Sequence, residues 1–337
     1  MNVLVTGGAG YIGSHTMVEL LNAGHEVVCI DNFMNSKFES VRRVEHITGK
    51  KVKFYEGDIR DRAILDKIFT ENKIDSVINF AGLKAVGESV AKPLEYYENN
   101  IEGLLILCFA MRDHNVKNLV FSSSATVYGK PKSVPIKEDF PLSTSNPYGS
   151  TKLFIEYMLK DLFHADPSFN IAILRYFNPV GAHESGLIGE DPKGIPNNLC
   201  PYITQVAVGK REYLGVFGDD YETPDGTGVR DFIHVVDLAK GHVLAVDKLA
   251  TNPGLIIVNL GTGVGYSVLD MVHAFEKVVG KPIPYKIMPR RPGDIGECYA
   301  DPSLAYEVLG FKATKTIDDM CKDAMRWQTQ NPNGYEE

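Results

Sequence analysis

The chain has 337 residues, 44% of them hydrophobic, which is enough to bury one large or two moderate cores without disulfide bonds or a cofactor. A formal net charge of −8 disfavours non-specific binding to nucleic acid or to an anionic membrane, so an anionic ligand would need a local basic site. Five cysteines, scattered and without a C-x-x-C pair, argue against a disulfide framework and against a zinc site.

The start of the chain and its apolar runs bear on location. Met1 leads directly into an apolar segment, with no basic region followed by a long hydrophobic stretch. The apolar run from Leu104 to Met111 is far too short to span a bilayer. With free thiols expected, we predict a soluble, cytoplasmic protein that binds neither nucleic acid nor membrane.

The N-terminal segment predicts a dinucleotide-binding unit. The buried-strand pattern at 3–5 runs into the glycine-rich stretch TGGAGYIG (6–13), and a helical pattern follows. Glycines in this context allow a tight turn and close approach of a pyrophosphate to the helix N-terminus. The second strand (26–30) ends at Asp31, where a carboxylate can hold the adenosine ribose 2′-OH and repel a 2′-phosphate. NAD is therefore favoured over NADP.

Strand and helix patterns then continue to alternate. We expect strands at 52–56, 76–80, 118–121 and 171–177, a helix from about 61, and a helix from Pro93 to Asp113. Alternation predicts an α/β fold with a doubly wound parallel sheet of Rossmann type. Ligands bind such sheets beyond the carboxyl ends of the strands, which makes the segments 58–59, 81–84 and 122–124 candidates for the site.

A tyrosine and a lysine four residues apart can form a general base. Asn146 and Pro147 predict the N-cap and first position of a helix, so Tyr148 lies in its first turn and Lys152 one turn later on the same face. A nearby ammonium favours the phenolate and lowers the tyrosine pKa. The spacing alone also fits an ordinary amphipathic helix. Ser124 would complete the site if it lay beside Tyr148.

The pattern changes after the strand at 171–177. Pro- and Gly-rich loops from 179 to 201 predict the start of a smaller α/β domain, which gives an NAD-binding domain at 1–178 and a substrate domain at 179–337. The region 230–262 contains a helix and a strand expected to return in part to the first domain. Arg290 and Arg291 either form a fork for a phosphate or are a solvated surface pair.

Further motifs carry a family resemblance over nearly the whole chain. They are GDIRD (57–61), FAGLKAVGES (80–89), SSSATVYG (122–129), RYFNPVGAH (175–183), GIPNNL (194–199) and DGTGVRDFIHV (225–235). With these motifs the chain resembles the extended short-chain dehydrogenase/reductase family, and within it the isomerases that epimerise UDP-sugars at C4. The resemblance implies interconversion of UDP-galactose and UDP-glucose in galactose metabolism, through a 4-keto sugar and tightly bound NAD.

The resemblance also implies roles for individual residues. Tyr148 would be the base, Lys152 would hold the nicotinamide ribose and lower the Tyr148 pKa, and Ser124 would relay the sugar proton. The residues implied to surround NAD are Gly7, Gly10, Tyr11, Ile12, Gly13, Asp31, Asn32, Asn35, Ser36, Asp58, Ile59, Phe80, Ala81, Gly82, Lys84, Asn99, Ser122, Ser124, Tyr148, Lys152 and Tyr176. Those implied to hold the UDP-sugar are Ser124, Tyr148, Asn178, Asn198, Leu199, Phe217, Arg230, Arg291, Asp294 and Cys298.

Two residues depart from the common family pattern. Phe232 stands where many members have tyrosine, and Cys298 stands where some have a bulky tyrosine. The small Cys298 would leave room for an N-acetyl group, so UDP-GalNAc and UDP-GlcNAc are expected substrates as well. No metal site is expected.

Two alternatives remain open on the same fold. A nucleotide-sugar dehydratase or decarboxylase would carry an acidic residue where this chain has Ala125 and Thr126. A non-catalytic NAD-sensing module would not need Tyr148, Lys152 and Ser124 together.

The resemblance finally implies a homodimer. The helix from Pro93 and the helix beginning at Tyr148 would pair with their copies as a four-helix bundle. The apolar residues compatible with this are Leu104, Leu107, Cys108, Met111, Phe154, Met158 and Phe163, although core packing explains the same spacing.

Overall fold

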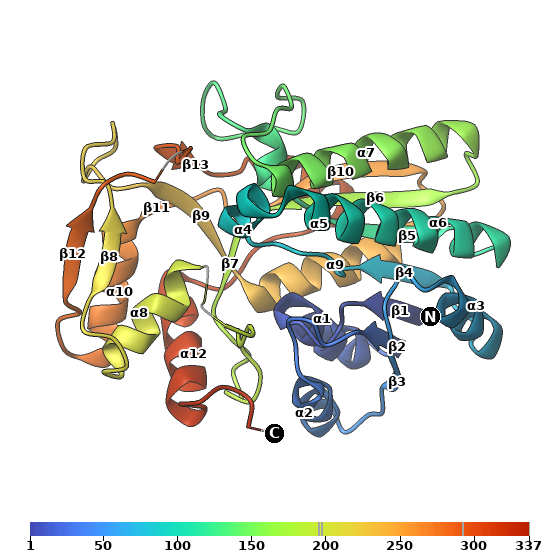
Figure 1. Ribbon diagram of the computed structural model, residues 1–337, viewed down its shortest axis with the longest axis horizontal. Coiled ribbons are helices and arrows are strands. Elements are labelled where there is room, and N and C mark those ends of the chain that lie inside the picture. Colours follow the sequence, from blue (N-terminus) through green and yellow to red (C-terminus); the bar gives the residue numbers. More distant parts are fainter. Residues whose placement is uncertain (195, 197, 292, 337) are drawn as a thin grey trace.

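The computed structural model describes residues 1–194, 196, 198–291 and 293–336, so the motif at 194–199 is described except at positions 195 and 197. Its larger sheet has seven parallel strands in the order β10-β6-β5-β4-β1-β2-β3 (Figure 1). The strands are β1 (Asn2–Thr6), β2 (Glu26–Asp31), β3 (Lys53–Glu56), β4 (Ser76–Asn79), β5 (Asn118–Ser124), β6 (Asn170–Tyr176) and β10 (Leu255–Leu260).

The strand order reverses between β1 and β4. From β1 the chain goes to β2 and β3 on one side, then crosses to β4 on the other side. At such a switch point the loops leave the sheet in opposite directions and open a crevice at the carboxyl ends of the strands. The predicted doubly wound α/β fold is confirmed.

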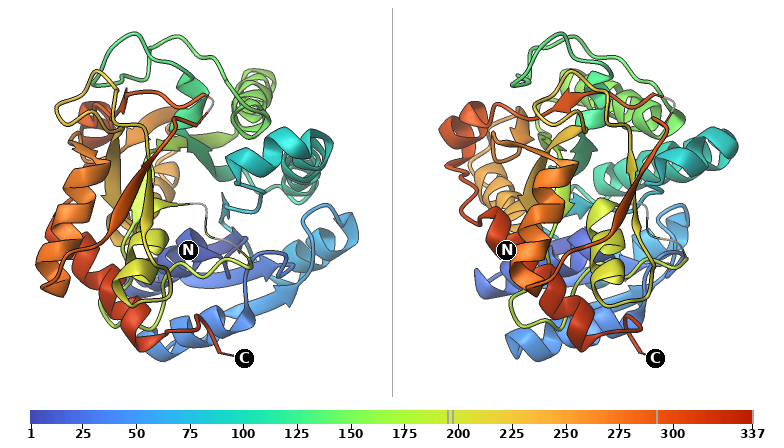
Figure 2. Two further views of the ribbon diagram at one scale, coloured as in Figure 1. Left: turned by 60° about the vertical axis from the view of Figure 1, so that its left-hand side comes forward. Right: turned by 90° about the vertical axis from the view of Figure 1, so that its left-hand side faces the viewer.

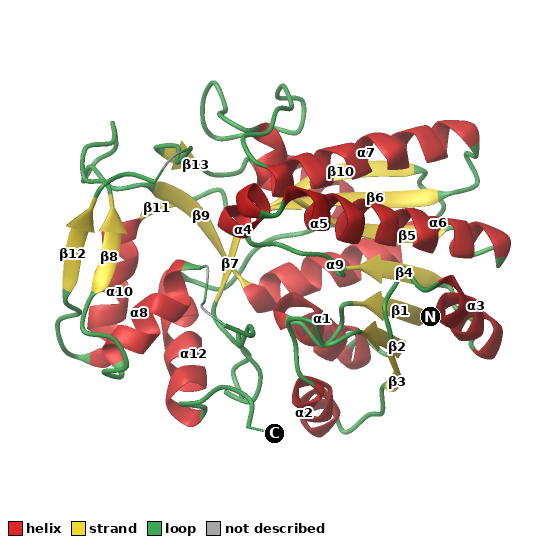
Figure 3. Cartoon of the chain, viewed as in Figure 1, coloured by secondary structure: helices red, strands yellow, loops and turns green. Residues whose placement is uncertain are grey.

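Helices cover both faces of this sheet because its strands are apolar on both sides (Figure 3). One core joins the sheet to α1 (Tyr11–Asn22), α2 (Phe38–Thr48), α9 (Val235–Leu249) and α11 (Ser303–Leu309). The other core joins it to α3 (Arg62–Glu71), α6 (Gly103–Asp113) and α7 (Pro147–Ala165).

A second group of elements lies at one end of the molecule (Figures 1 and 2). Its strands are β7 (Asn178–Val180), β9 (Val229–His234), β11 (Gly265–Ser267) and β13 (Glu297–Cys298), with β8 (Leu214–Phe217) and β12 (Tyr285–Met288) as a separate parallel pair. Its helices are α8 (Leu199–Ala207), α10 (Val268–Val279) and α12 (Ile317–Gln330), which surround a core of their own. No helix in the described part of the chain is long and apolar enough to cross a membrane.

The predicted return to the first sheet occurs at β10, which pairs in parallel with β6, while α9 packs against α1. The expected loop at 179–201 is not all loop, because β7 begins at Asn178 and α8 begins at Leu199. These pieces are too short to show a period in sequence. The domain boundary at 178 stays a prediction.

The single helix expected from Pro93 to Asp113 is interrupted. After α4 (Val86–Ala91) the chain forms α5 (Pro93–Tyr97), then a π-helical segment η1 (Glu98–Glu102), and only then α6. π-helical turns often occur at functional sites. This one contains Asn99, which lines the cavity described below, and Asn100, which accepts a hydrogen bond from Leu83 N.

A buried ion pair holds α7 against the sheet. The guanidinium of Arg175 on β6 donates to both carboxylate oxygens of Glu156 on α7, at 2.9 and 2.6 Å. Arg175 is 1% exposed and Glu156 is fully buried. The Ser123 hydroxyl donates to Glu156 at 2.7 Å, and Arg175 also donates to the Tyr128 hydroxyl at 3.0 Å. The hydrogen bonds offset the cost of burying both charges.

Replacing Glu156 with alanine should lower the free energy of unfolding by about 3–5 kcal/mol, because the Arg175 charge would stay buried without a partner. Urea denaturation measures the change. The matched control is Lys277→Ala, which removes a surface pair with Asp318 at 2.7 Å and should cost less than about 1 kcal/mol. Similar losses in both variants would contradict a special role for the buried pair.

Candidate functional site

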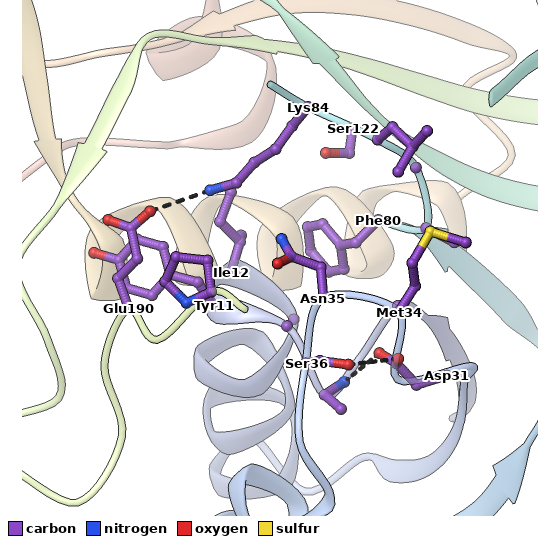
Figure 4. A pocket seen from close by; sticks show the side chains of 18 of the residues that line it. Tyr11, Ile12, Asp31, Met34, Asn35, Ser36, Phe80, Lys84, Ser122 and Glu190 are labelled. Atoms are coloured by element: carbon purple, nitrogen blue, oxygen red, sulfur yellow. Dashed lines mark hydrogen bonds and ion pairs between the residues drawn. The ribbon is translucent and has the colours of Figure 1, made fainter. Parts of the chain in front are cut away.

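A cavity of about 330 Å³ opens at the carboxyl ends of β1, β4, β5 and β6 (Figure 4). Every residue predicted to surround NAD lines it, and so do Asn178 and Asn198 of the predicted substrate set. The other predicted substrate residues do not line it; these are Leu199, Phe217, Arg230, Arg291, Asp294 and Cys298.

The glycine-rich loop forms one wall of the cavity, and two of its glycines are required by close packing. Gly7 has a φ of +68°, and a Cβ there would lie 2.7 Å from the Ala81 nitrogen. A Cβ at Gly13 would lie 2.5 Å from the Gly7 carbonyl oxygen. The N-cap of α1 is Gly10, which has no side chain to cap the first turn. The helix N-terminus is therefore available to an anionic group such as a pyrophosphate.

Asp31 joins this loop to the end of β2. Its carboxylate accepts hydrogen bonds from Ala9 N at 3.0 Å, Phe33 N at 2.9 Å and the Ser36 hydroxyl at 2.7 Å. Burial raises the Asp31 pKa, while these three donors lower it. A carboxylate has about four lone-pair sites, so one remains for a ribose hydroxyl. The residue fits the predicted adenosine end of NAD.

The adjoining wall carries a second acidic group with its own partners. Asp58 accepts from the Arg60 guanidinium at 2.9 and 3.0 Å and from the Asn32 amide at 2.9 Å. The hydrogen bond from Arg60 is the main cause that lowers the Asp58 pKa to about 2. Asp58 therefore remains ionised and holds the Asn32 side chain in place.

The predicted start of α7 is confirmed. Asn146 accepts from Gly149 N at 2.8 Å as the N-cap, and Pro147 occupies the first helical position. The ammonium of Lys152 lies 5.9 Å from the centre of the Tyr148 ring. Both residues line the cavity together with Ser124, which ends β5. The three side chains proposed for catalysis are thus brought to one place.

The Tyr148 pKa shifts in the direction opposite to the one predicted from the nearby Lys152. Burial raises the Tyr148 pKa above its ordinary value, and the Ser124 hydroxyl offsets this only in part. Burial also lowers the Lys152 pKa to about 8. The ammonium donates to the Ser122 carbonyl at 2.7 Å. The prediction considered only the attraction between the two groups, whereas burial penalises the charged form of each.

A second cluster of predicted residues lies outside the cavity, around Tyr221. Arg291 donates to Asp294 at 2.8 Å, and its guanidinium lies 5.0 Å from the centre of the Phe217 ring. Burial and Asp294 raise the Tyr221 pKa, while nearby arginines that include Arg230 and Arg291 lower it. The cluster therefore combines positive charge with an aromatic face, as a nucleotide diphosphate requires.

Arg290 and Arg291 make different contacts, which distinguishes the two interpretations of this pair. Arg290 donates to Asp220 at 2.6 Å on the surface, so the surface-pair interpretation applies to it. Arg230 stands opposite Cys298 in the register of β9 and β13. Cys298 therefore borders the arginine implied to hold the substrate.

Comparison with known proteins gives consistent matches along the chain. A family profile described as GDP-mannose 4,6 dehydratase matches residues 4–324. The UDP-glucose 4-epimerase of Bacillus subtilis is 62% identical over 335 residues, 99% of each chain. That of Homo sapiens is 59% identical over 340 residues, 99% of this chain and 98% of the human one. This chain belongs to the UDP-glucose 4-epimerase family.

Solved epimerase structures agree with this assignment. The Bifidobacterium longum epimerase in complex with NAD+ and UDP matches with a TM-score of 0.97 at 61% identity, covering 99% of this chain and 100% of that one. The Campylobacter jejuni UDP-Glc/GlcNAc 4-epimerase matches with a TM-score of 0.85 at 35% identity, covering 98% and 99%. The resemblance drawn from the motifs is confirmed.

Asn100 supports the wall of this cavity, and the sequence did not reveal it. Its side-chain oxygen accepts from Leu83 N at 2.7 Å, and its amide donates to the Leu83 carbonyl and to the Thr151 hydroxyl, each at 3.0 Å. It thereby ties the loop after β4 to α7. The sequence pattern predicted a continuous helix here, so it did not show that Asn100 lies buried in a π-helical turn.

Glu190 was missed as well. One of its carboxylate oxygens accepts from the Lys84 ammonium at 3.2 Å (Figure 4). The same oxygen accepts from the Asn198 amide at 2.6 Å. Lys84 belongs to the predicted cofactor set and Asn198 to the predicted substrate set. An acidic residue in a long loop shows no periodicity, so only the folded structure places Glu190 between the two sets.

Proposed function

We propose that the chain interconverts UDP-galactose and UDP-glucose with retained NAD. One observation carries the proposal: a single cavity combines the glycine-rich helix N-terminus and Asp31 with Ser124, Tyr148 and Lys152. A dinucleotide cradle beside a tyrosine base is the arrangement that oxidation of a sugar hydroxyl requires. The epimerase relatives, identical at about six residues in ten, support the same reaction.

Each side chain at the cavity has its own role in the proposed reaction. Tyr148 takes the proton of the C4 hydroxyl, directly or through Ser124, and returns it when the 4-keto sugar is reduced. NAD, held by the glycine-rich turn and Asp31, would supply the hydride chemistry without net redox change, and its positive ring would favour the phenolate of Tyr148. Gly7 and Gly13 allow the close packing of the loop that presents the N-terminus of α1 to the pyrophosphate, and Asp31 holds the ribose.

The second group of elements is proposed to bind the substrate. Arg230 and Arg291 carry the charge that a diphosphate needs, and Phe217 offers an apolar face beside Arg291. Asn178 and Asn198 reach the cavity itself, so they are proposed to hold the sugar end. The 4-keto sugar must turn over in this space to accept hydride on its other face.

The two alternatives have less support. The matching profile carries a dehydratase description, yet Ala125 and Thr126 supply no carboxylate at the position where elimination needs one. Thr126 instead donates to the Ser124 hydroxyl at 3.0 Å. A non-catalytic NAD module would not require the three side chains that converge on the cavity.

The native protein should convert UDP-galactose to UDP-glucose without added cofactor and release NAD when denatured. Tyr148→Phe should lower turnover by about 10²- to 10⁴-fold while bound NAD is kept, because only the proton acceptor is lost. Tyr306→Phe, at an exposed tyrosine, is the matched control. Retention of more than about a tenth of the activity in Tyr148→Phe would show that another group is the base.

We propose that Cys298 admits both sugar pairs. Forcing a larger side chain into a packed site costs about 1–3 kcal/mol, or roughly 5- to 150-fold. Cys298→Tyr should therefore lower kcat/KM for UDP-GlcNAc far more than for UDP-glucose, whereas Cys298→Ala should leave the two activities in the wild-type ratio. Wild type without activity on UDP-GlcNAc, or a tyrosine variant equally active on both, would refute the pocket role.

We also propose a homodimer formed by α5, α6 and α7. Four residues named for this surface are in fact core residues, namely Leu104, Leu107, Cys108 and Met111, all buried. Exposed apolar side chains on these helices include Leu94, Leu105, Phe109, Phe154 and Tyr157. The rings of Phe154 and Tyr97 are stacked with their centres 6.2 Å apart. Such a patch is typical of an association surface.

Light scattering at micromolar concentration should give twice the chain mass, and Phe154→Asp should shift the protein toward monomer. Lys277→Ala, on the exposed face of α10, is the control. A wild-type monomer would reject the dimer.

A cytoplasmic location is proposed from the five free cysteines.

A further inference from the structure

The C-terminal segment of the chain lies against the cofactor cavity. Tyr335 is 5% exposed and lines the cavity, although it is separated in sequence from all other lining residues. Its ring lies 4.9 Å from that of Trp327, and the guanidinium of Arg43 on α2 lies 5.1 Å from it. The chain end is therefore packed against the first domain beside α2 (Figure 1).

Asp191 and Lys37 complete this contact. The Asp191 carboxylate accepts from Tyr335 N at 2.8 Å and pairs with the Lys37 ammonium at 3.2 Å. Lys37 also donates to the Tyr335 carbonyl at 2.9 Å. Three segments thus meet in one closed set of contacts: the loop before α2, the loop before α8, and the C-terminus.

The same loop before α2 is bound at a second point. Lys193 N donates to the Asn35 side chain at 3.0 Å, and the Lys193 ammonium donates to the Phe33 carbonyl at 2.6 Å. This loop carries Asn35 and Ser36, both predicted to contact NAD, and Ser36 in turn donates to Asp31 at 2.7 Å. Contacts from the second domain therefore fix the adenosine side of the cavity.

We propose that Asp191 and Tyr335 are positioning residues of the cofactor site, which hold the segment 33–37 closed and so slow the release of NAD. The inference rests on the proposed function, in which one NAD is used over many turnovers without leaving. If only first-domain residues formed the cofactor site, movement of the segment 33–37 would be enough to open it. Here it cannot open until the contacts to Asp191 and Tyr335 break.

The test measures release of NAD and not activity. Purified protein is incubated with excess isotopically labelled NAD, and label incorporation is followed after desalting. Asp191→Ala should exchange about 10- to 100-fold faster than wild type, because it removes a charge-assisted hydrogen bond and its ion pair. Asp318→Ala, which also loses one lysine partner but far from the cavity, should exchange at the wild-type rate.

Two further measurements separate positioning from general destabilisation. Added salt should speed exchange in wild type and have little effect in Asp191→Ala, because the Lys37 pair is partly exposed and is screened. Lys37→Ala combined with Asp191→Ala should exchange no faster than the faster single variant, because both act on one contact. Thermal unfolding checks that each variant is folded at the temperature used.

The outcomes are distinct. Wild-type protein that contains no NAD would overturn the proposed function and this inference with it. Protein that contains NAD, but in which Asp191→Ala exchanges at the wild-type rate, would overturn the inference alone. Multiplicative rates in the double variant would also overturn it, since the residues would then act separately.

Discussion

The bidentate pair between Arg175 and Glu156 is the interaction on which the site depends. It joins β6 to the middle of α7, and α7 carries Tyr148 and Lys152 in its first two turns. A buried ion pair contributes little net stability but demands one geometry, because a small shift would leave a charge unpaired in the interior. The helix can therefore be seated in one register only, with Tyr148 facing the end of β5.

Burial shapes the chemistry of the cavity as strongly as it shapes the fold. Lys152 is buried and Tyr148 is half-buried at the wall of the cavity, and this burial disfavours both the phenolate and the ammonium relative to their neutral forms. Proton removal at Tyr148 therefore needs further positive charge beside it, which a nicotinamide ring can supply. In the proposed reaction, Tyr148 would therefore become an effective base only when NAD is bound beside it.

The long loop before α8 links the two halves of the molecule through adjacent acids. Glu190 turns inward to Lys84 and Asn198, whereas Asp191 turns to Lys37 and Tyr335. One short segment thus contacts a residue proposed to bind the cofactor, a residue proposed to bind the substrate and the C-terminal segment. Such a loop can hold the two sets of proposed binding residues at a constant separation, as the proposed hydride transfer requires.

Much of the fold and part of the site could be predicted from sequence because their causes are local. The glycines at 7, 10 and 13, the strand end at Asp31 and the Asn146-Pro147 helix start each follow from backbone geometry within a few residues. Alternation of strand and helix then places the strand ends at one edge, which is why all residues predicted for NAD line one cavity. The expectation of a UDP-sugar substrate came from the motif resemblance.

What the tertiary structure alone decided concerns contacts between distant segments. Glu190 and Tyr335 reach the cavity from a loop and the chain end, and Asn100 supports its wall from a π-helical turn; no period or spacing marks these residues in the sequence. The direction of the Tyr148 pKa also depends on burial, which is a property of the packed interior and not of the residue pair. Sequence by itself determined which groups are present and which local turns they occupy, whereas desolvation and long-range hydrogen bonds arise only when the chain has closed around them.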